Sequence, residues 1–299
     1  MKPTKISIIG AGNVGSSIAY ALILKNIPAT IKLIDIDEKR CRGEILDLSD
    51  ALAFCGSSNI SSGTPKDAQE SDIIIIAAGR NQKPGEDRIQ LYNNNKKVIT
   101  KIMETIRPVK NDGIIIMVTN PLDLLTFEVQ KLSNLPHSHI FGTGTFLDTQ
   151  RLRNILSQKL HIAEQSIHAY ILGEHGDTQF PAWSCAYVAG IPIDSFPELD
   201  QETLKKIALE AKTRASEIIS CKGATYWGIA TTVATICRTI IFDQKRVTPL
   251  SVYLDTFDVC LSMPVVLGKN GIEKILEIPL SKLEKQQLAL SAEFLKKLL

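Results

Sequence analysis

The stretch Gly173-Glu174-His175-Gly176-Asp177 contains the residue types of an acid–base site. Histidine is the one side chain whose ordinary pKa lets it give and take a proton near neutral pH, and glycines on both sides of it let a substrate approach closely. A positioned general acid or base contributes roughly 10²–10⁴ in rate. The alternative interpretation is a turn histidine with a satisfied hydrogen bond and no catalytic role. The residues expected near His175 must decide between the two interpretations.

Two charged residues of a later helix are candidates to assist this histidine. A helix that begins near Phe146 places Asp148 and Arg151 on one face, together with two apolar residues at helical spacing. If that face packs on the core, both charges must pair or bind something. One alternative is an internal salt bridge between Asp148 and Arg151. In the other, Asp148 accepts a hydrogen bond from Nδ1 of His175 and raises the pKa of His175, while Arg151 binds a substrate carboxylate through two hydrogen bonds.

A glycine-rich loop near the start of the chain predicts a dinucleotide site. A short apolar strand, residues 5–9, runs into Gly10-Ala11-Gly12-Asn13-Val14-Gly15, and a helix over 16–25 follows. This order suits a pyrophosphate bound at a helix N-terminus. A second strand, 31–35, ends in Asp35, 20 residues after Gly15, where a carboxylate accepts hydrogen bonds from a ribose and repels a 2′-phosphate. NAD is therefore expected rather than NADP, the alternative being a plain glycine-rich turn.

The first half of the chain has the pattern of a parallel sheet covered on both faces. Residues 72–79 and 114–118 are continuous apolar runs, separated by helical stretches such as 38–54 and 95–106. We therefore predict an α/β fold with a doubly wound parallel (Rossmann) sheet, whose ligand lies at the carboxyl ends of the strands.

Two polar segments follow these strands. The loop over residues 80–88 contains Pro and Gly, ends in Arg88 and is predicted to act as a lid; a solvated arginine is the alternative. After the next strand comes Thr119-Asn120-Pro121, where the proline favours an extended Asn120 whose amide is free to enter the crevice. For Asn120 the alternative is a cap of the helix that starts at Leu122.

The second half is expected to be a C-terminal α+β substrate domain. Helices are predicted over 201–221, from the glycine-punctuated stretch 223–229 onward, and over 282–299. Before the last helix, shorter strands are predicted over 250–254, 259–267 and 272–277. Asn270-Gly271 is a predicted hairpin turn. We divide the chain into 1–144, a cofactor-binding domain, and 145–299, a substrate-binding and catalytic domain.

Composition narrows the classes of function. Lys+Arg 34 against Asp+Glu 32 gives a net charge of +2 without a basic block, so no nucleic-acid partner is expected. No apolar run reaches the length of a membrane span and no secretory leader is recognisable, which predicts a cytoplasmic protein without a membrane partner. Six scattered cysteines without metal-ligand spacing predict reduced thiols and no bound metal.

The motifs together resemble the NAD-dependent lactate/malate dehydrogenase family, and bacterial lactate dehydrogenases in particular, over almost the whole chain. The segments that carry the resemblance are the Gly10–Gly12–Gly15 loop, Asp35, Gly43-Glu44 through Asp47-Leu48, 81–86, 119–121, 142–144, 147–148, 173–177, Lys222-Gly223 with Trp227, and 258–262. The resemblance implies reversible hydride transfer between NADH and pyruvate giving (S)-lactate, a place in glycolysis and fermentation, and a homotetramer.

The resemblance also implies a role for each site residue. His175 is the proton donor and acceptor, Asp148 its orienting partner, Arg151 the carboxylate clamp, and Arg88 the group that polarises the carbonyl. Substrate contacts fall on Gln82, Arg88, Asn120, Arg151 and Thr225. Cofactor contacts fall on Gly10, Gly12, Asn13, Val14, Gly15, Asp35, Gly79, Asn95, Val118, Asn120 and Ile229.

Substrate choice rests mainly on Gln82. Similar malate enzymes carry an arginine there, which pairs with the second carboxylate of their substrate, whereas a neutral Gln leaves that carboxylate unpaired. Asp87 stands where Thr or Ser is usual, and Ala224 where Tyr is common. These departures keep a broader L-2-hydroxy acid dehydrogenase open, because a larger pocket would admit longer 2-oxo acids. A malate dehydrogenase, which differs in substrate only, is the nearest other alternative.

Two further interpretations and one regulatory site remain. An NAD-using glycoside hydrolase of related fold would carry a metal-binding cysteine where Thr119-Asn120-Pro121 stands. A non-catalytic nucleotide sensor would not need Asp148, Arg151 and His175 together. Arg153 and His168 resemble the fructose bisphosphate site of allosteric bacterial lactate dehydrogenases, built between subunits; a surface Arg and a strand His are the alternative.

Overall fold

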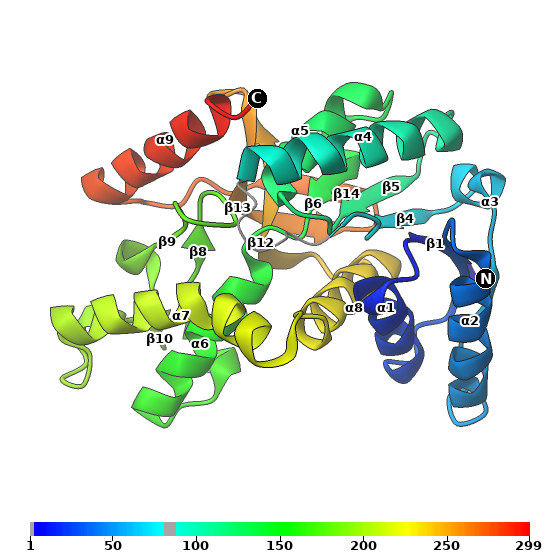
Figure 1. Ribbon diagram of the computed structural model, residues 1–299. Coiled ribbons are helices and arrows are strands. Elements are labelled where there is room, and N and C mark those ends of the chain that lie inside the picture. Colours follow the sequence, from blue (N-terminus) through cyan, green and yellow to red (C-terminus); the bar gives the residue numbers. More distant parts are fainter. Residues whose placement is uncertain (1–2, 81–87) are drawn as a thin grey trace.

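A single nine-stranded sheet runs through the molecule, with helices on both of its faces (Figure 1). The computed structural model describes residues 3–80 and 88–299. The strand order is β14-β13-β12-β6-β5-β4-β1-β2-β3. The strands are β1 (Thr4–Ile9), β2 (Ala29–Ile34), β3 (Asn59–Ser62), β4 (Ile73–Ile76), β5 (Ile114–Met117), β6 (Ile140–Gly142), β12 (Arg246–Leu254), β13 (Val259–Gly268) and β14 (Gly271–Ile275).

The six N-terminal strands are parallel and form the predicted doubly wound sheet. Their order reverses between β1 and β4, since the chain winds outward through β2 and β3 on one side and through β5 and β6 on the other. Every residue of β4 and β5 is buried, which explains the runs of isoleucine. The crevice at the carboxyl ends of β1 and β4 is where such sheets bind ligands.

The helices pack both within and between the two halves of the chain. α1 of the first half packs on α8 of the second half, whereas α4 and α5 pack together within the first half, and Figure 1 shows these two helices side by side above the sheet. The helices are α1 (Asn13–Leu24), α2 (Glu38–Leu52), α3 (Pro65–Gln69), α4 (Arg88–Ile106), α5 (Leu122–Leu132), α6 (Phe146–Leu160), α7 (Gln201–Lys222), α8 (Trp227–Ile241) and α9 (Lys282–Lys296), with short 3-10 turns at His137–His139, Glu164–Ser166, Trp183–Cys185 and Ile193–Ser195.

The C-terminal strands extend the same sheet rather than forming a separate one. β12 lies antiparallel to β6, with Ser251 opposite Gly142. β12 is longer than the predicted strand 250–254, whereas β13 agrees with the predicted 259–267 within one residue. Gly271 has φ +82 at the predicted turn between β13 and β14. The division at 144/145 therefore falls inside a continuous sheet, and it remains a proposal.

A second, smaller core lies beside this sheet. Buried Leu152 and Ile155 of α6 pack with Leu204 and Ile207 of α7. Two small sheets flank it, one of β7 (Ile167–His168), β10 (Tyr187–Val188) and β11 (Ile191–Pro192), the other of β8 (Ile171–Leu172) and β9 (Phe180–Pro181). This part of the chain is the α+β region expected from the sequence.

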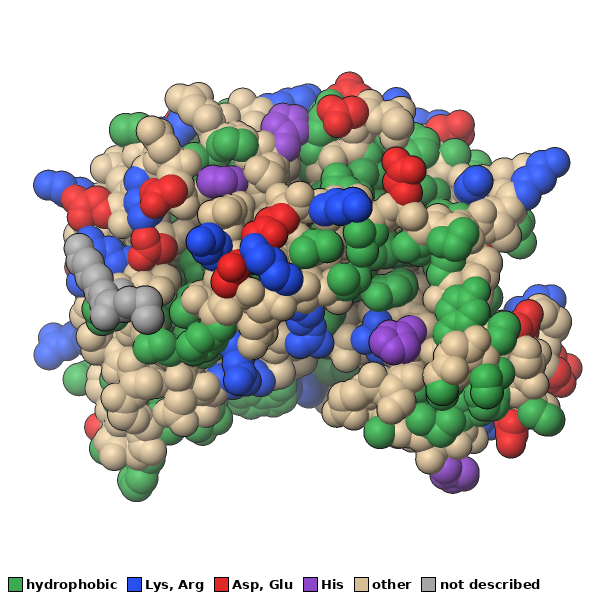
Figure 2. Space-filling model, turned by 180° about the vertical axis from the view of Figure 1, so that it is seen from behind, with side chains coloured by type: hydrophobic (Ala, Val, Ile, Leu, Met, Phe, Trp, Pro, Cys, Tyr) green, Lys and Arg blue, Asp and Glu red, His purple; other side chains and the backbone are tan. Residues whose placement is uncertain are grey.

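The surface carries charges of both signs side by side. Seen from behind, Lys, Arg, Asp and Glu side chains are scattered among apolar ones, and the molecule is hollowed along its lower edge in that view (Figure 2). Among the described residues, no helix has both the length and the apolar character needed to cross a membrane.

Candidate active site

His175 lies on the turn between β8 and β9, and its backbone is fixed by two distant elements. The turn is anchored to β13 by paired backbone hydrogen bonds between Gly173 and Ser262. The N–H of His175 donates to Oδ2 of Asp123, in the first turn of α5, over 2.7 Å. The other oxygen of Asp123 accepts from the Ser251 hydroxyl on β12 at 2.5 Å. Asp123 and Ser251 were not among the site residues predicted from the sequence, although an acid inside the apolar α5 segment was a usable signal.

The His175 side chain pairs with Asp148, and Asp148 also pairs with Arg151. The His175 Nδ1 to Asp148 Oδ2 distance is 2.7 Å, and Arg151 Nη1 donates to Asp148 Oδ1 over 2.9 Å. The two interpretations offered for this helix face are therefore not exclusive, because one buried carboxylate holds both cationic groups. Nδ1 donates to the carboxylate, which leaves Nε2 of the 27% exposed imidazole for a substrate.

Burial and neighbouring charges shift the pKa values of these groups in opposite directions. Burial alone would lower the pKa of His175, but the adjacent Asp148 carboxylate raises it above its ordinary 6.5. Burial would likewise raise the pKa of Asp148, yet His175 and Arg151 hold it below its usual value. Burial raises the pKa of Asp123 to about 6, in spite of the hydrogen bonds from Ser251 and His175.

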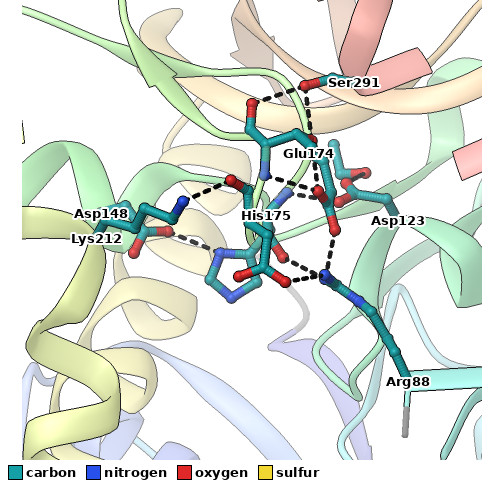
Figure 3. Close-up of polar contacts among 10 residues, drawn as sticks. Arg88, Asp123, Asp148, Glu174, His175, Lys212 and Ser291 are labelled. Carbon is teal, nitrogen blue, oxygen red and sulfur yellow. Dashed lines mark hydrogen bonds and ion pairs between the residues drawn. The ribbon is translucent and has the colours of Figure 1, made fainter. Parts of the chain in front are cut away.

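Arg88 reaches the same turn from the first residue of α4. Its Nη2 lies 2.5 Å from Oε1 of the fully buried Glu174 and 3.3 Å from the carbonyl oxygen of His175, while Nη1 lies 3.4 Å from Asp177 (Figure 3). The alternative interpretation of Arg88 as a solvated loop arginine is therefore wrong. Gln82 and Asp87, in the predicted lid, lie outside the described residues.

The glycine loop has the features of a phosphate cradle. A Cβ on Gly15 would overlap the carbonyl oxygen of Gly10, whereas a Cβ on Gly12 would have nothing within 4 Å. Gly12 caps α1 without a side-chain hydrogen bond, so the first amides of α1 keep their donors for a phosphate. Asp35 follows β2 and accepts from the N–H of Ala11 at 2.6 Å, which places its carboxylate at the loop. These residues fit a dinucleotide.

Asn95 connects the next two strand ends. Its side chain is fully buried and exchanges hydrogen bonds with the backbone of Arg80, and its Nδ2 donates to the carbonyl of Asn120 at 2.7 Å. Gly79 lies against Thr119 and Asn95 and has no room for a side chain. Asn120 itself is exposed, and α5 is capped by Pro121 without a side-chain bond, so the helix-cap interpretation of Asn120 is wrong.

The remaining predicted residues occupy the expected elements. Asn13 and Val14 begin α1, where Asn13 accepts from Arg40 at 3.2 Å; Val118 and Ile229 are half-buried against the core, and Thr225 is half-buried before α8. Arg153 donates from Nε to the carbonyl of Ala169 at 3.0 Å and stacks over Tyr170, and His168 is exposed on β7. The described residues contain no group of three or more His, Cys, Asp or Glu placed to hold a metal ion.

Both halves of the chain match models of one protein family. Residues 4–142 match the NAD binding domain of lactate/malate dehydrogenase, and residues 145–299 match its alpha/beta C-terminal domain. The chain belongs to the lactate/malate dehydrogenase family. Its N-terminal part is thus an NAD-binding domain, and NAD is its cofactor, as predicted.

Similar proteins agree over the full length. The chain is 41% identical to the L-lactate dehydrogenase of Lacticaseibacillus casei, over 99% of this chain and 93% of that one, and 42% identical to that of Acetivibrio thermocellus, over 99% and 96%. A lactate dehydrogenase from a Medee basin deep-sea metagenome library has a TM-score of 0.94 at 38% identity, covering 100% of this chain and 98% of that one. The minor L-lactate dehydrogenase of Enterococcus mundtii, in a ligands-bound form, has a TM-score of 0.95 at 36% identity with the same coverage.

Proposed function

We propose that this chain is an NAD-dependent L-lactate dehydrogenase, which interconverts pyruvate and NADH with (S)-lactate and NAD. The observation that carries the proposal is the Asp148 carboxylate bound to His175 and Arg151 at once, because it places a proton donor next to a group that binds carboxylates. The full-length similarity to L-lactate dehydrogenases supports it.

Each polar residue of the site has a task in this reaction. Bound NADH supplies the hydride for the carbonyl carbon. Nε2 of His175 gives its proton to the carbonyl oxygen, while Asp148 stabilises the imidazolium and fixes its orientation. Arg88 polarises the carbonyl, and the donors of Arg151 not used by Asp148 hold the substrate carboxylate.

The other residues of the proposed site bind and select. Gln82, Asn120 and Thr225 contact the substrate, and the glycine loop, Asp35 and the strand-end residues bind the cofactor. We propose pyruvate as the preferred substrate because a neutral Gln82 offers no partner for a second carboxylate. A cytoplasmic enzyme of glycolysis and fermentation is part of the same proposal.

The proposal is tested by NADH oxidation with pyruvate and oxaloacetate side by side, in the parent and in Gln82→Arg. We expect pyruvate to be reduced faster by the parent and oxaloacetate to gain by orders of magnitude in the variant. Faster reduction of oxaloacetate by the parent would make the chain a malate dehydrogenase. Reduction of neither acid would contradict the assignment to pyruvate.

Assembly into a homotetramer and activation by fructose bisphosphate are the finer parts of the proposal. Two copies each of Arg153 and His168 would hold the sugar phosphate between subunits. The hydrogen bond from Arg153 to the carbonyl of Ala169, the residue after the exposed His168, supports this. Light scattering reports the assembly. Pyruvate saturation curves with and without the sugar phosphate report activation, and an unchanged half-saturation at every pH from about 5.5 to about 7.5 would contradict it.

A further inference from the structure

Glu174 is a buried carboxylate that the proposed reaction does not use. Its side chain has no exposed surface, and its Oε2 accepts from the N–H of Thr178 at 3.1 Å and from the Thr178 hydroxyl at 2.5 Å. Its Oε1 faces Arg88 at 2.5 Å and has no hydrogen bond within the described part of the chain. A buried carboxylate of this kind is costly unless a cation compensates it, and Arg88 is the cation at that oxygen.

The backbone around Glu174 is shaped to receive the guanidinium. Gly176 has no side chain, and a Cβ built there would overlap Nη2 of Arg88 and lie 2.6 Å from Oε1 of Glu174. The carbonyl oxygen of His175 and the carboxylate of Asp177 take further donors of the same guanidinium (Figure 3). Arg88 therefore lies against the turn that carries the proton donor, in a recess that only glycine leaves open.

Two helices hold this arrangement from the sides. The guanidinium carbon of Arg88 lies 5.6 Å from the ring centre of Phe294 on α9, and Ser291 of the same helix donates to the carbonyl of Thr178. Lys212 of α7 donates to the carbonyl of Asp177 at 2.6 Å. α7 and α9 thus hold the backbone of the turn that carries Glu174 and Asp177.

We infer that Glu174 is a positioning residue for Arg88: it holds the guanidinium beside His175 so that the donors left over point toward the substrate carbonyl. This inference rests on the proposed function, in which Arg88 polarises that carbonyl. Displacement of a catalytic group by about 1 Å costs on the order of 10²-fold in rate. The gain in rate from a fixed Arg88 can therefore outweigh the free-energy cost of burying the Glu174 carboxylate. The close approach of Arg88 also explains why residue 176 is a glycine.

A double-mutant cycle with Glu174→Gln and Arg88→Gln tests the inference, with pyruvate and NADH as substrates. Glu174→Gln keeps the shape and removes the charge, and we expect kcat to fall by about tenfold or more while NADH affinity stays unchanged. In the Arg88→Gln background the same substitution should change kcat by less than about twofold, because the residue it positions is gone.

Glu284→Gln is the matched control. Glu284 is also a buried carboxylate held by a hydroxyl residue and by backbone N–H groups, from Ser184 at 3.0 Å and Ser281 at 2.8 Å, but it lies at the start of α9, away from Arg88. We expect this variant to lose stability and keep the kcat of the parent. An equal loss of kcat for Glu174→Gln in both backgrounds would overturn the inference, and so would a gain of activity, which would mean that the ion pair keeps Arg88 from the substrate.

A second measurement does not depend on turnover. Modification of Arg88 by phenylglyoxal, followed by peptide mass spectrometry, should be several-fold faster in Glu174→Gln than in the parent and unchanged in Glu284→Gln. Equal rates in Glu174→Gln and the parent would overturn the positioning role. If the parent does not reduce pyruvate, the proposed function fails, whereas these modification rates still decide whether Glu174 holds Arg88.

Discussion

At the scale of single residues, Asp148 decides in which pH range His175 carries its proton. The carboxylate raises the pKa of His175 by favouring the imidazolium. In the proposed mechanism pyruvate reduction consumes that proton, so it should persist to higher pH than a free histidine would allow. Above the raised pKa, kcat/KM for pyruvate must fall as pH rises. Lactate oxidation needs the neutral imidazole, so its kcat/KM must fall as pH is lowered below that pKa.

We expect Asp148→Asn to lower kcat/KM for pyruvate by about 10²–10⁴ near neutral pH, because the amide neither stabilises the imidazolium nor fixes its tautomer. The limb of the pH profile should move toward acid, since the pKa of His175 falls when the charge is lost. Steady-state kinetics from pH 5 to about 9 measure the limb. A limb at the same pH in the variant and the parent would show that Asp148 does not set the pKa of His175.

Most of these residues were recognisable in the sequence, but their connections were not. His175, Asp148 and Arg151 stand out because charges at these spacings have few other uses. Asp123 did not, because its partners lie 52 and 128 residues away and no local spacing reports a contact over that distance.

At the scale of elements, two glycines of the loop have different tasks: Gly15 allows close packing, and Gly12 leaves space for the cofactor. Gly15→Ala should lower the free energy of unfolding by about 1–3 kcal/mol or more, because its Cβ overlaps the Gly10 carbonyl. Gly12→Ala should change stability by less than about 0.5 kcal/mol, since the space is open. It should nevertheless weaken NADH binding at least about tenfold, because we propose that the pyrophosphate binds in that space.

Gly43→Ala is the control for this pair. Gly43 is exposed on α2 and also has nothing within 4 Å of a Cβ, so the substitution should leave NADH binding unchanged. Urea unfolding and fluorescence titration with NADH give both quantities. Unchanged NADH affinity in Gly12→Ala would place the pyrophosphate elsewhere.

Asp123 makes the junction of α5, β12 and the catalytic turn sensitive to pH. Its folded-state pKa of about 6 lies above its ordinary 3.8, so the folded state binds the proton more tightly. The stability that this proton contributes is fully present below 3.8 and is lost as pH rises to about 6, a change of about 3 kcal/mol.

Asp123→Asn cannot titrate, and its amide can still accept from His175 and donate to Ser251. The free energy of unfolding of the variant, minus that of the parent, should therefore rise between about pH 4 and about pH 6 by up to about 3 kcal/mol. Urea unfolding at fixed protein concentration measures this difference, in which the other titrating groups cancel. A difference independent of pH would show that Asp123 is not the group that titrates.

Elements differed in how well their sequences predicted them. β4 and β5 were evident from continuous isoleucine. α4 begins at Arg88 rather than near Asn95, and Leu91 and Tyr92, which are buried in its first two turns, were a usable signal that was missed. β12 begins at Arg246 rather than at the predicted Leu250, because its first two residues are exposed and the buried Pro249 is not typical of a strand interior. The pairing of β12 with β6 was not predicted, because nothing local encodes it.

At the scale of the whole molecule, that pairing bears on whether the chain has two independent domains. The sheet passes from β6 to β12, and buried residues of α8, such as Val233 and Ile236, belong to the same core as Ile6 and Ile75. Separating residues 1–144 from the rest would expose the edge of β6 and uncover α1 where α8 packs.

We therefore expect the chain to unfold as one cooperative unit across the proposed 144/145 division. In native-state hydrogen exchange at fixed protein concentration, the slowest amides of β4 and β5 should open with the same free energy as those of β12 and β13, because neither set is exposed without breaking the shared sheet. Residues 1–144 produced alone should bind a hydrophobic dye and give no cooperative transition. Two distinct opening free energies, with a stably folded 1–144 fragment, would show instead that the β6–β12 contact is a weak interface between separate domains.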